Sequence, residues 1–327
     1  MIISQTPLRM SFVGGGSDLA AYYRRHGGAV VSTAIDQYVY VTVNRKFDER
    51  IRVSYSQTEE VGSVRSVRHP LVRESLRQVG VKGGVEITSI ADVPSRGTGL
   101  GSSSSFTVGL LHALHAWRGE YRSAEQLARE ACEIEIERCG EPIGKQDQYA
   151  AAYGGLNFIE FYPDERVSVQ PIVCRPELLR ELQSRLLVFY TGITRPAAKV
   201  LEEKQRRIAT EASKQAVLGR MVELARTLRA ELQGHNLAAF GEILHENWEL
   251  KKRLARDVSS ARIDAWYEAA RRAGAIGGKI LRAGSGGFLL FFAPPARHEA
   301  IRRALSTLRP VPMRFEPQGS RILFVHH

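Results

Sequence analysis

The side chains best suited to take part in a reaction form an acidic segment in the first half of the chain. A helical pattern rich in glutamate includes Glu133, Glu135 and Glu137, and a Gly-Pro turn then leads to Asp147. Because Glu135 and Asp147 are twelve residues apart across this turn, they can converge, one on Mg²⁺ and the other on a substrate hydroxyl. Taken alone, the pattern also fits a solvated helix face followed by an aspartate that caps a helix.

A second segment, residues 92–105, reads DVPSRGTGLGSSSS between a predicted strand and an apolar helix. Glycines let the backbone approach a ligand closely, and the free N–H groups at a helix start favour an anion. The segment therefore predicts a cradle for a triphosphate, but it is neither a Walker A loop nor a GxGxxG dinucleotide motif. The alternative is a Gly/Ser linker that ends in a helix cap, although linkers seldom continue into a helix as apolar as FTVGLLHAL.

Two further glycine-rich segments lie towards the ends of the chain. Residues 7–18 place Arg9 and Asp18 on either side of a triple glycine, and Asp18 could bind a polyol or cap a helix near 18–25. Taken alone, the capping interpretation is the stronger of the two. Residues 277–288, which include Gly286, could contact a substrate or form only a tight entry into a strand.

Hydrophobic periodicity predicts the elements that must position these segments. Strand patterns occur at 28–44, 50–55, 84–90, 155–161, 167–172, 185–190, 287–292, 311–316 and 320–325. Helical patterns occur at 105–117, 123–138, 196–233, 236–255, 260–274 and 296–308. Together they predict an α+β fold with two domains, residues 1–182 and 183–327.

Composition excludes several classes of protein. Of the 327 residues, 43% are hydrophobic and 25% charged, which is typical of a globular protein. No stretch has the roughly 18 apolar residues of a membrane helix, and the N-terminus lacks the features of a signal peptide, so we expect a cytoplasmic protein. An odd number of cysteines without a CxxC pair argues against disulfides or zinc, and Cys132 and Cys139 are expected in the core.

The formal net charge of +11 is compatible with nucleic acid, an anionic surface or phosphorylated small molecules as partners. The basic residues are spread along the patterns at 199–230 and 251–272 and alternate with Glu and Asp, as on solvated helix faces. No nucleic-acid-binding motif is present. We therefore expect a small phosphorylated substrate, with no nucleic acid and no membrane as partner. The sequence leaves the oligomeric state open and is compatible with a homo-oligomer.

Four motifs follow one another along the chain: PLRMSFVGGGSD, GLGSSSS, GKQDQ and GSGGF. In this order they resemble the GHMP kinase superfamily, which is named for galactokinase, homoserine kinase, mevalonate kinase and phosphomevalonate kinase. The resemblance extends from residue 7 to residue 292. It implies an N-terminal domain like ribosomal protein S5 domain 2, a C-terminal ferredoxin-like domain and an active site in the cleft between them.

Within the superfamily, the chain is similar to the sugar-1-kinases that act on D-glycero-α-D-manno-heptose 7-phosphate. The similarity rests on LRMSFVGGGSD at 8–18, GKQDQYAAAYGG at 144–155 and TGITR at 191–195. In galactokinases, Glu-His replaces the last two glycines of the first motif. That departure counts against galactose as the substrate.

The resemblance also implies how the chain would bind ATP and Mg²⁺. The cradle for the ATP phosphates would consist of Gly97, Gly99, Leu100, Gly101, Ser102, Ser103 and Ser104. Ser103 would also bind Mg²⁺ together with Glu135, and Glu137 is the rival because the helix register is open at this point.

For the acceptor, the resemblance implies that Asp147 receives or orients the proton of the attacking hydroxyl and that Arg9 lies close to it. Both Arg9 and Lys145 are cations that should keep Asp147 ionised. Sugar hydroxyls would contact Asp18. The remaining candidates for substrate contacts are Gly15, Gly16, Ser17, Gly286, Arg195 and Arg282, of which the two arginines, with Lys199 nearby, would bind a sugar phosphate.

These features predict an ATP-dependent kinase that converts heptose 7-phosphate to the 1,7-bisphosphate, in the synthesis of nucleotide-activated heptose for surface glycans. A kinase of another sugar, such as fucose, mannose or a uronic acid, is the alternative within the enzyme class. The competing class is a non-catalytic protein of the same fold that binds a ligand or nucleic acid. An ATPase-coupled assay over a panel of sugars separates these hypotheses.

Overall fold

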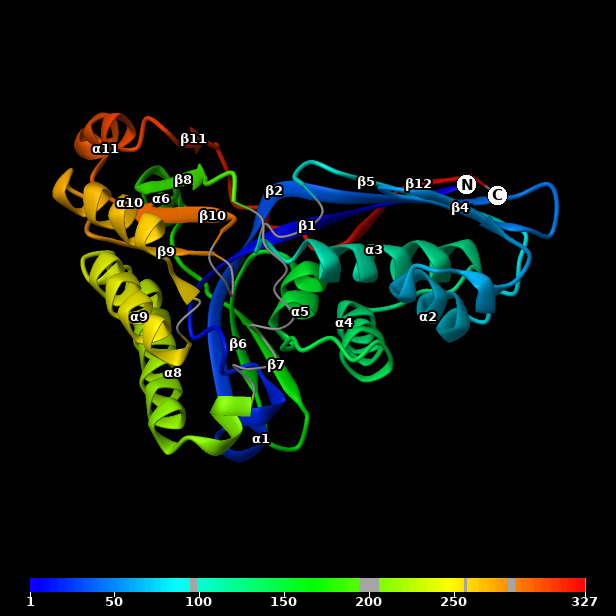
Figure 1. Ribbon diagram of the computed structural model, residues 1–327, viewed down its shortest axis with the longest axis horizontal. Helices are drawn as coiled ribbons and strands as arrows, with labels where there is room; N and C mark the ends of the chain where they lie inside the picture. Colours follow the sequence, from blue (N-terminus) through cyan, green and yellow to red (C-terminus); the bar gives the residue numbers. More distant parts are fainter. Residues whose placement is uncertain (95–98, 194–205, 256–257, 282–285, 327) are drawn as a thin grey trace.

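The computed structural model describes residues 1–327 except 95–98, 194–205, 256–257, 282–285 and 327. The described residues form two sheets that lie beside one another along the long axis of the molecule (Figure 1). Nearly all strand pairs are antiparallel, and helices cover the sheets. The predicted α+β class is therefore confirmed.

The larger sheet has the strand order β12-β1-β2-β5-β3-β4, and β6 and β7 extend it from the first half of β2. Its strands are β1 (Ile2–Val13), β2 (Gly28–Arg45), β3 (Ile51–Ser54), β4 (Thr58–Val61), β5 (Val85–Ala91), β6 (Leu156–Phe161), β7 (Val167–Pro171) and β12 (Arg321–Val325). The long strand β2 pairs with β6 through Gly28–Thr33 and with β5 through Val39–Arg45. It therefore links both halves of the sheet.

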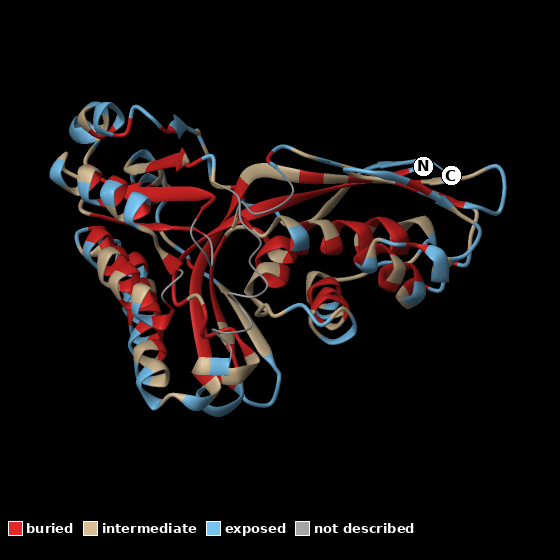
Figure 2. Cartoon of the chain, in the orientation of Figure 1, coloured by how far each residue is buried: buried red, intermediate tan, exposed pale blue. Residues whose placement is uncertain are grey.

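Strand β1 is central to the fold, yet the sequence patterns do not predict it. Every residue of β1 except Ile3 is buried. Helix α3 (Ser102–Trp117) packs on β1 from the first half of the chain, and α8 (Ala212–Gln233) and α9 (Phe240–Leu254) pack on it from the second. A strand that is covered on both faces shows no alternation of polar and apolar residues. Figure 2 shows how continuous this burial is where the two halves meet.

Helices cover one face of the larger sheet. They are the 3₁₀ turn η1 (Val64–Ser66), α2 (Pro70–Val79), α3, α4 (Ala124–Cys132), the π-helical segment η2 (Glu133–Arg138) and α5 (Gln146–Tyr153). The short helix α1 (Ala20–His26) instead contacts α8 of the second half. The helices predicted at 105–117 and 123–138 are confirmed, but the second changes to π-helical geometry at Glu133. A π-helical turn rotates the residues that follow it relative to an α-helix.

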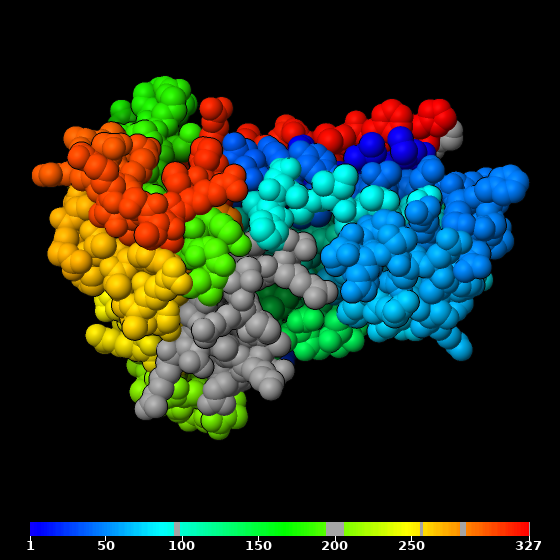
Figure 3. Space-filling model, turned by 45° about the horizontal axis from the view of Figure 1, so that its top comes forward, coloured from blue at the N-terminus to red at the C-terminus, as the bar shows by residue number. Residues whose placement is uncertain are grey.

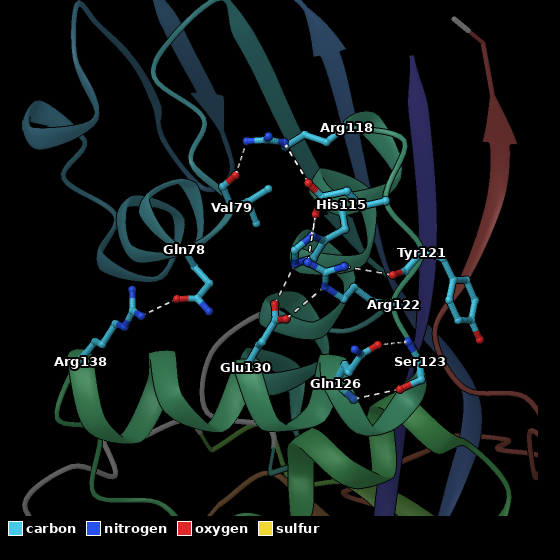
Figure 4. A network of polar contacts seen from close by, with 11 residues as sticks. Gln78, Val79, His115, Arg118, Tyr121, Arg122, Ser123, Gln126, Glu130 and Arg138 are labelled. Atoms are coloured by element: carbon cyan, nitrogen blue, oxygen red, sulfur yellow. Dashed lines mark hydrogen bonds and ion pairs between the residues drawn. The ribbon is translucent and has the colours of Figure 1, made fainter.

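A polar network fixes α4 on α3 and so sets the position of η2 (Figure 4). The buried His115 ring of α3 lies between two carboxylates, with Glu120 at 2.9 Å from Nδ1 and Glu130 of α4 at 2.8 Å from Nε2. Arg122 donates to both carboxylates. At the C-terminal end of the continuous helix formed by α4 and η2, Arg138 of η2 donates to Gln78 of α2.

The smaller sheet has the order β11-β8-β10-β9 and belongs to the second half of the chain. Its elements and the helices around it are α6 (Pro176–Ser184), β8 (Leu186–Tyr190), α8 (Ala212–Gln233), α9 (Phe240–Leu254), α10 (Ala261–Arg272), β9 (Gly277–Ile280), β10 (Phe288–Phe292), η4 (Pro295–Arg297), α11 (His298–Ala304) and β11 (Arg309–Pro310). A second core forms here around Trp248, Tyr267 and Phe291.

Three predictions about the second half need correction. The strand predicted at 311–316 is wrong: β11 is limited to Arg309–Pro310, and Phe315 makes an isolated bridge to Ile35. The single helix predicted over 196–233 is interrupted at Glu211, whose backbone is extended, so that α8 begins at Ala212. The strand predicted at 320–325 forms as β12, but it pairs with β1 in the larger sheet (Figure 3). The domain boundary near residue 182 stays a prediction, and α6 spans it.

The remaining general expectations concern membranes and cysteines. Among the described residues, no helix has both the length and the apolar character needed to cross a membrane. The three cysteines are unpaired, and Cys132 is buried as expected. Cys139 is only partly buried, because the π-helical segment has changed the register between the two residues.

The segment before β12 is held by a short hydrogen-bond chain that should make stability depend on pH. Ser320 Oγ lies 2.8 Å from Thr6 Oγ1 of β1 and 3.0 Å from His112 Nδ1 of α3. Burial lowers the pKa of His112 to about 4, with a smaller contribution from His115. The folded protein therefore keeps His112 neutral over a pH range in which the unfolded chain protonates it.

We predict that the free energy of unfolding rises between about pH 4 and pH 6.5 by on the order of 1–2 kcal/mol because of His112. His112→Gln should remove that part of the pH dependence, measured by urea unfolding at several pH values. The exposed His26→Gln variant controls for the general loss of a histidine. The same pH slope in wild type and His112→Gln would contradict the prediction.

Candidate active site

An ion pair between Arg9 of β1 and Asp147 of α5 lies at the centre of the site. Arg9 Nε donates to Asp147 Oδ1 at 2.8 Å, and a terminal nitrogen donates to Oδ2 at 2.9 Å. Arg9 is 7% exposed. A two-point contact of this kind gives both side chains a fixed orientation and requires an ionised carboxylate.

The same arginine holds the glycine-rich loop before α3. Arg9 Nη1 donates to Gly99 O at 2.6 Å, and the backbone N–H of Arg9 donates to Leu100 O at 3.0 Å. Gly99 and Gly101 both have left-handed backbones, with φ of 79° and 77°. A Cβ at Gly101 would lie 3.5 Å from Asp147 Oδ2, so the Asp147 carboxylate lies next to the loop at this glycine.

The loop ends at the start of α3, where the backbone N–H groups have no side-chain cap. Gly101 is the N-cap residue, and among the described residues no side chain caps the helix start. Ser102 is partly buried and Ser103 is exposed, whereas Leu100 and Ser104 are buried. The expected phosphate cradle is therefore open at Gly101, Ser102 and Ser103. Gly97 lies outside the described residues.

Glu135 of η2 is buried beneath this loop and accepts four side-chain hydrogen bonds. Ser103 Oγ lies 2.9 Å from Oε1 and Ser104 Oγ lies 2.7 Å from Oε2, while Thr107 and Gln148 complete the shell. Burial raises the pKa of Glu135 to about 7, against the effect of these donors. Glu137 is exposed. Of the two rivals, the structure places Glu135 beside Ser103 and turns Glu137 to solvent.

This group of oxygen atoms fits Mg²⁺. The ion prefers a carboxylate, a hydroxyl, water and phosphate oxygens to a cage made only of protein ligands. A buried carboxylate with a raised pKa gains from a nearby cation. The described residues contain no group of three His, Cys, Asp or Glu side chains that could hold a metal by themselves, so Glu135 and Ser103 would share the ion with the phosphates of ATP.

Several charges act on the Asp147 carboxylate. Burial raises its pKa, and Arg9 opposes this effect, while Asp18 raises the pKa and Lys251 lowers it. The ion pair with Arg9 is thus the main stabiliser of the charged form. As expected from the sequence, Arg9 favours ionised Asp147.

Lys145, the second cation expected near Asp147, pairs with a different carboxylate. Its ammonium group bonds Glu165 in the turn between β6 and β7 and lies over the Tyr23 ring, 4.8 Å from the centroid. Glu165 supplies a carboxylate in hydrogen-bonding contact, so the charge of Lys145 is paired there. The structure therefore places Lys145 as a residue that fastens the loop before α5.

Asp18 is buried, at 3% exposed, and does not cap α1. Its carboxylate accepts from Gly16 N at 2.8 Å and from Gln146 Nε2 at 3.1 Å. It thereby connects the triple-glycine loop to the start of α5. Ser17 bonds the backbone of Gly14 and Ala29, so its hydroxyl is used within the loop.

The second half of the chain contributes residues that the sequence analysis missed. Asn247 of α9 accepts from Gly14 N at 3.1 Å, and Lys279 of β9 donates to the carbonyls of Ser11 and Phe12 at 2.6 and 2.9 Å. Lys251 lies one turn after Asn247 on the same face of α9. A polar residue at position 247, within the apolar periodicity of the helix, was the available signal.

Close backbone approach brings α9 to this position. A Cβ at Gly277 of β9 would lie 1.9 Å from Gly241 O of α9, so the strand and the helix touch through their backbones. In the third glycine-rich segment, a Cβ at Gly286 would lie 2.4 Å from Ile193 O, which favours the tight strand entry. Arg195, Lys199 and Arg282 lie outside the described residues.

The arrangement suits phosphoryl transfer. A helix start that could bind an anion, a buried carboxylate suited to Mg²⁺ and an aspartate paired with an arginine meet where α3, α5 and β1 converge (Figure 1). Transfer of a phosphoryl group depends mainly on positioning and on neutralising charge. Asp147 would lie on the acceptor side of the loop.

Comparison with known proteins agrees with this geometry. The family models "GHMP kinases N terminal domain" and "GHMP kinases C terminal" match residues 66–155 and 228–309. D-glycero-alpha-D-manno-heptose 7-phosphate kinase of Campylobacter jejuni is 31% identical over 319 residues, which cover 93% of each protein.

Solved structures show the same fold. A D-glycero-D-manno-heptose 1-phosphate kinase from Bacteroides thetaiotaomicron superposes with a TM-score of 0.82 at 27% identity over all of both chains. The galactokinase of Lactococcus lactis has a TM-score of 0.78 at 16% identity, covering 98% of this chain and 94% of its own, and shares the fold. The chain therefore belongs to the GHMP kinase family and is an ATP-dependent kinase with the two-domain fold of that family.

Proposed function

We propose that this sugar kinase phosphorylates the C1 hydroxyl of D-glycero-α-D-manno-heptose 7-phosphate to give the 1,7-bisphosphate and ADP. The observation that supports the proposal is the position of the Asp147 carboxylate, which is paired with Arg9 and lies next to Gly101, at the helix start that would bind the ATP phosphates. The product would serve the synthesis of nucleotide-activated heptose.

In the proposed reaction, the acceptor hydroxyl donates a hydrogen bond to Asp147 and its oxygen attacks the γ-phosphorus of ATP. The new bond joins the sugar oxygen to phosphorus, the bond from phosphorus to the β–γ bridging oxygen breaks, and ADP leaves. The hydroxyl proton passes to Asp147 or, after the transfer, to water. Arg9 holds Asp147 in the required orientation and lies close enough to stabilise negative charge.

The other charged groups have complementary roles in this proposal. Mg²⁺, held by Glu135 and Ser103, would neutralise charge on the phosphates of ATP. The N–H groups at the start of α3 would bind phosphate oxygens. The sugar phosphate requires a cation far from the attacked hydroxyl, and Arg195 and Arg282 remain the candidates.

The choice of sugar rests on the relatives. The Campylobacter jejuni kinase that is 31% identical is named for heptose 7-phosphate, and the Bacteroides structure is named for heptose 1-phosphate. The first motif also has glycines at 15 and 16, where galactokinases carry Glu-His. These observations together favour a heptose phosphate over galactose as the acceptor.

Asp147→Asn should leave the fold intact and lower kcat by about a thousandfold, because a neutral amide replaces the ionised acceptor in a phosphoryl-transfer site. Steady-state kinetics and urea unfolding would be measured together. Asp164→Asn, in the exposed turn between β6 and β7, is the matched control. A kcat near that of wild type would refute the role of Asp147.

Glu135→Gln and Glu137→Gln should differ strongly, since only Glu135 lies beside Ser103. We expect Glu135→Gln to lose about a hundredfold in kcat and to need more Mg²⁺ for half-maximal activity. Glu137→Gln should behave as a surface change. Equal Mg²⁺ titrations for both variants and wild type would show that this helix does not serve the metal.

Wild type should prefer heptose 7-phosphate to unphosphorylated heptose or mannose in kcat/KM. Of Arg195→Gln and Arg282→Gln, at least one should lower kcat/KM about tenfold or more for the phosphorylated sugar. The unphosphorylated sugar and the KM for ATP should change little. If wild type shows no preference for the phosphorylated sugar, heptose 7-phosphate is wrong and a kinase of another sugar takes its place.

A further inference from the structure

The three glycines of the first loop are not equivalent. Gly14 has a φ of 89°, and a Cβ there would lie 2.0 Å from Ala29 O; Gly16 has a φ of 111°. These two positions need glycine for backbone reasons. Gly15 has no positive φ, and every atom near an added Cβ would be at least 3.5 Å away. The backbone therefore does not explain why residue 15 is a glycine.

Polar side chains face the space that Gly15 leaves open. The position of the missing Cβ lies 3.5 Å from Ser11 Oγ of β1, 3.6 Å from Gln146 Nε2 and 3.9 Å from Gln146 Oε1. Ser32 of β2 is directly opposite Ser11 in the β1–β2 ladder, so both hydroxyls lie on one face of the sheet. We call the space that Gly15, Ser11 and Gln146 border, together with the Ser32 hydroxyl on the strand beside Ser11, the hydroxyl niche.

Three polar atoms of the niche are buried and lack a hydrogen-bond partner within the described part of the chain. They are Ser11 Oγ, Ser32 Oγ and Gln146 Oε1. Ser11 is 5% exposed and Ser32 is 1% exposed. Burying an unpaired polar atom is unfavourable, and an ordered water or a ligand usually satisfies such a group. Two such atoms beside one glycine, with a third on the residue paired with Ser11, indicate that something polar binds there.

Asp18 fixes what the niche can offer to a ligand. A carboxylate only accepts hydrogen bonds, so the amide nitrogen of Gln146 must face Asp18 Oδ2, at 3.1 Å. Gln146 Oε1 is then left as an acceptor, while the hydroxyls of Ser11 and Ser32 can donate or accept. This set complements an alcohol, which donates to the amide oxygen and accepts from a serine. A phosphate oxygen would instead face Gln146 Oε1 and the nearby Asp18 carboxylate.

We propose that Ser11, Ser32 and Gln146 bind a neutral hydroxyl of the acceptor sugar and thereby determine specificity, with Asp18 as the positioning residue that orients Gln146. Gln146 immediately precedes Asp147, so the niche lies beside the carboxylate that would orient the attacking hydroxyl. The inference rests on the proposed sugar kinase function and deepens it. It assigns the substrate phosphate to a different part of the site.

The test compares Gly15→Ala and Ser11→Ala with two matched controls. Gly62→Ala adds a methyl group where no atom lies within 4 Å, and Ser75→Ala removes another buried hydroxyl without a partner, on α2. Wild-type turnover of heptose 7-phosphate is measured first. We expect both niche variants to raise the KM for the sugar about tenfold, with KM for ATP and Tm close to those of the controls.

Monodeoxy analogues of the same sugar identify the bound hydroxyl. For one analogue, Ser11→Ala and wild type should have the same KM, because the group that Ser11 contacts is already missing. Asp18→Asn should raise the sugar KM more than it changes kcat or the KM for ATP, since an asparagine lets the Gln146 amide turn over.

The outcomes separate the two proposals. If wild type phosphorylates a sugar but Gly15→Ala and Ser11→Ala leave its KM unchanged, the niche holds only a structural water and this inference fails. If wild type acts on a different sugar, the heptose assignment fails and the niche is tested with that sugar. A wild type that phosphorylates no sugar in the panel overturns both.

Discussion

The ion pair between Arg9 and Asp147 is the interaction on which the site depends. It joins the central strand β1 to the start of α5, and the same guanidinium holds the carbonyl of Gly99 in the glycine-rich loop. One buried arginine thus fixes the relative positions of the candidate phosphate cradle and the acceptor side of the site. Without Arg9, a buried carboxylate and a loop carbonyl would both lose their partner, and burial would raise the pKa of Asp147 without opposition from its nearest cation.

Arg9 can hold this position because β1 is covered on both faces. Helix α3 packs on one side, and α8 and α9 of the second half pack on the other. The second half also reaches the loop that follows β1, through Asn247 on Gly14 and Lys279 on the carbonyls of Ser11 and Phe12. These contacts make the first loop a shared structure of both halves. Its geometry, and with it the hydroxyl niche, depends on the packing of α9 against β9 through Gly241 and Gly277.

The π-helical segment η2 determines which glutamate lies beside the serines at the start of α3. Glu135 is buried under Ser103 and Ser104, whereas Glu137 is exposed, although the two residues are only two positions apart. The network around His115 and Glu130 anchors the preceding helix on α3, which limits where η2 can lie. A regular helical wheel cannot decide between the two glutamates once the helix changes its repeat.

The sequence by itself determined the class of fold, most of the elements and the family, because glycines, the serine run and the order of four motifs carry local physical meaning. It also paired Arg9 with Asp147 through the family resemblance, and the structure places these side chains in contact. It could not find β1, because burial on both faces removes any alternation of polar and apolar residues. Nor could it place β12 in the larger sheet, since strand pairing across more than 300 residues leaves no local pattern. The sequence also did not predict the partners of Lys145 and Asp18, because these come from other parts of the chain. Lys145 bonds Glu165, and Asp18 bonds Gln146. Local chemistry thus fixed which residues could act, and only tertiary packing decided which of them meet.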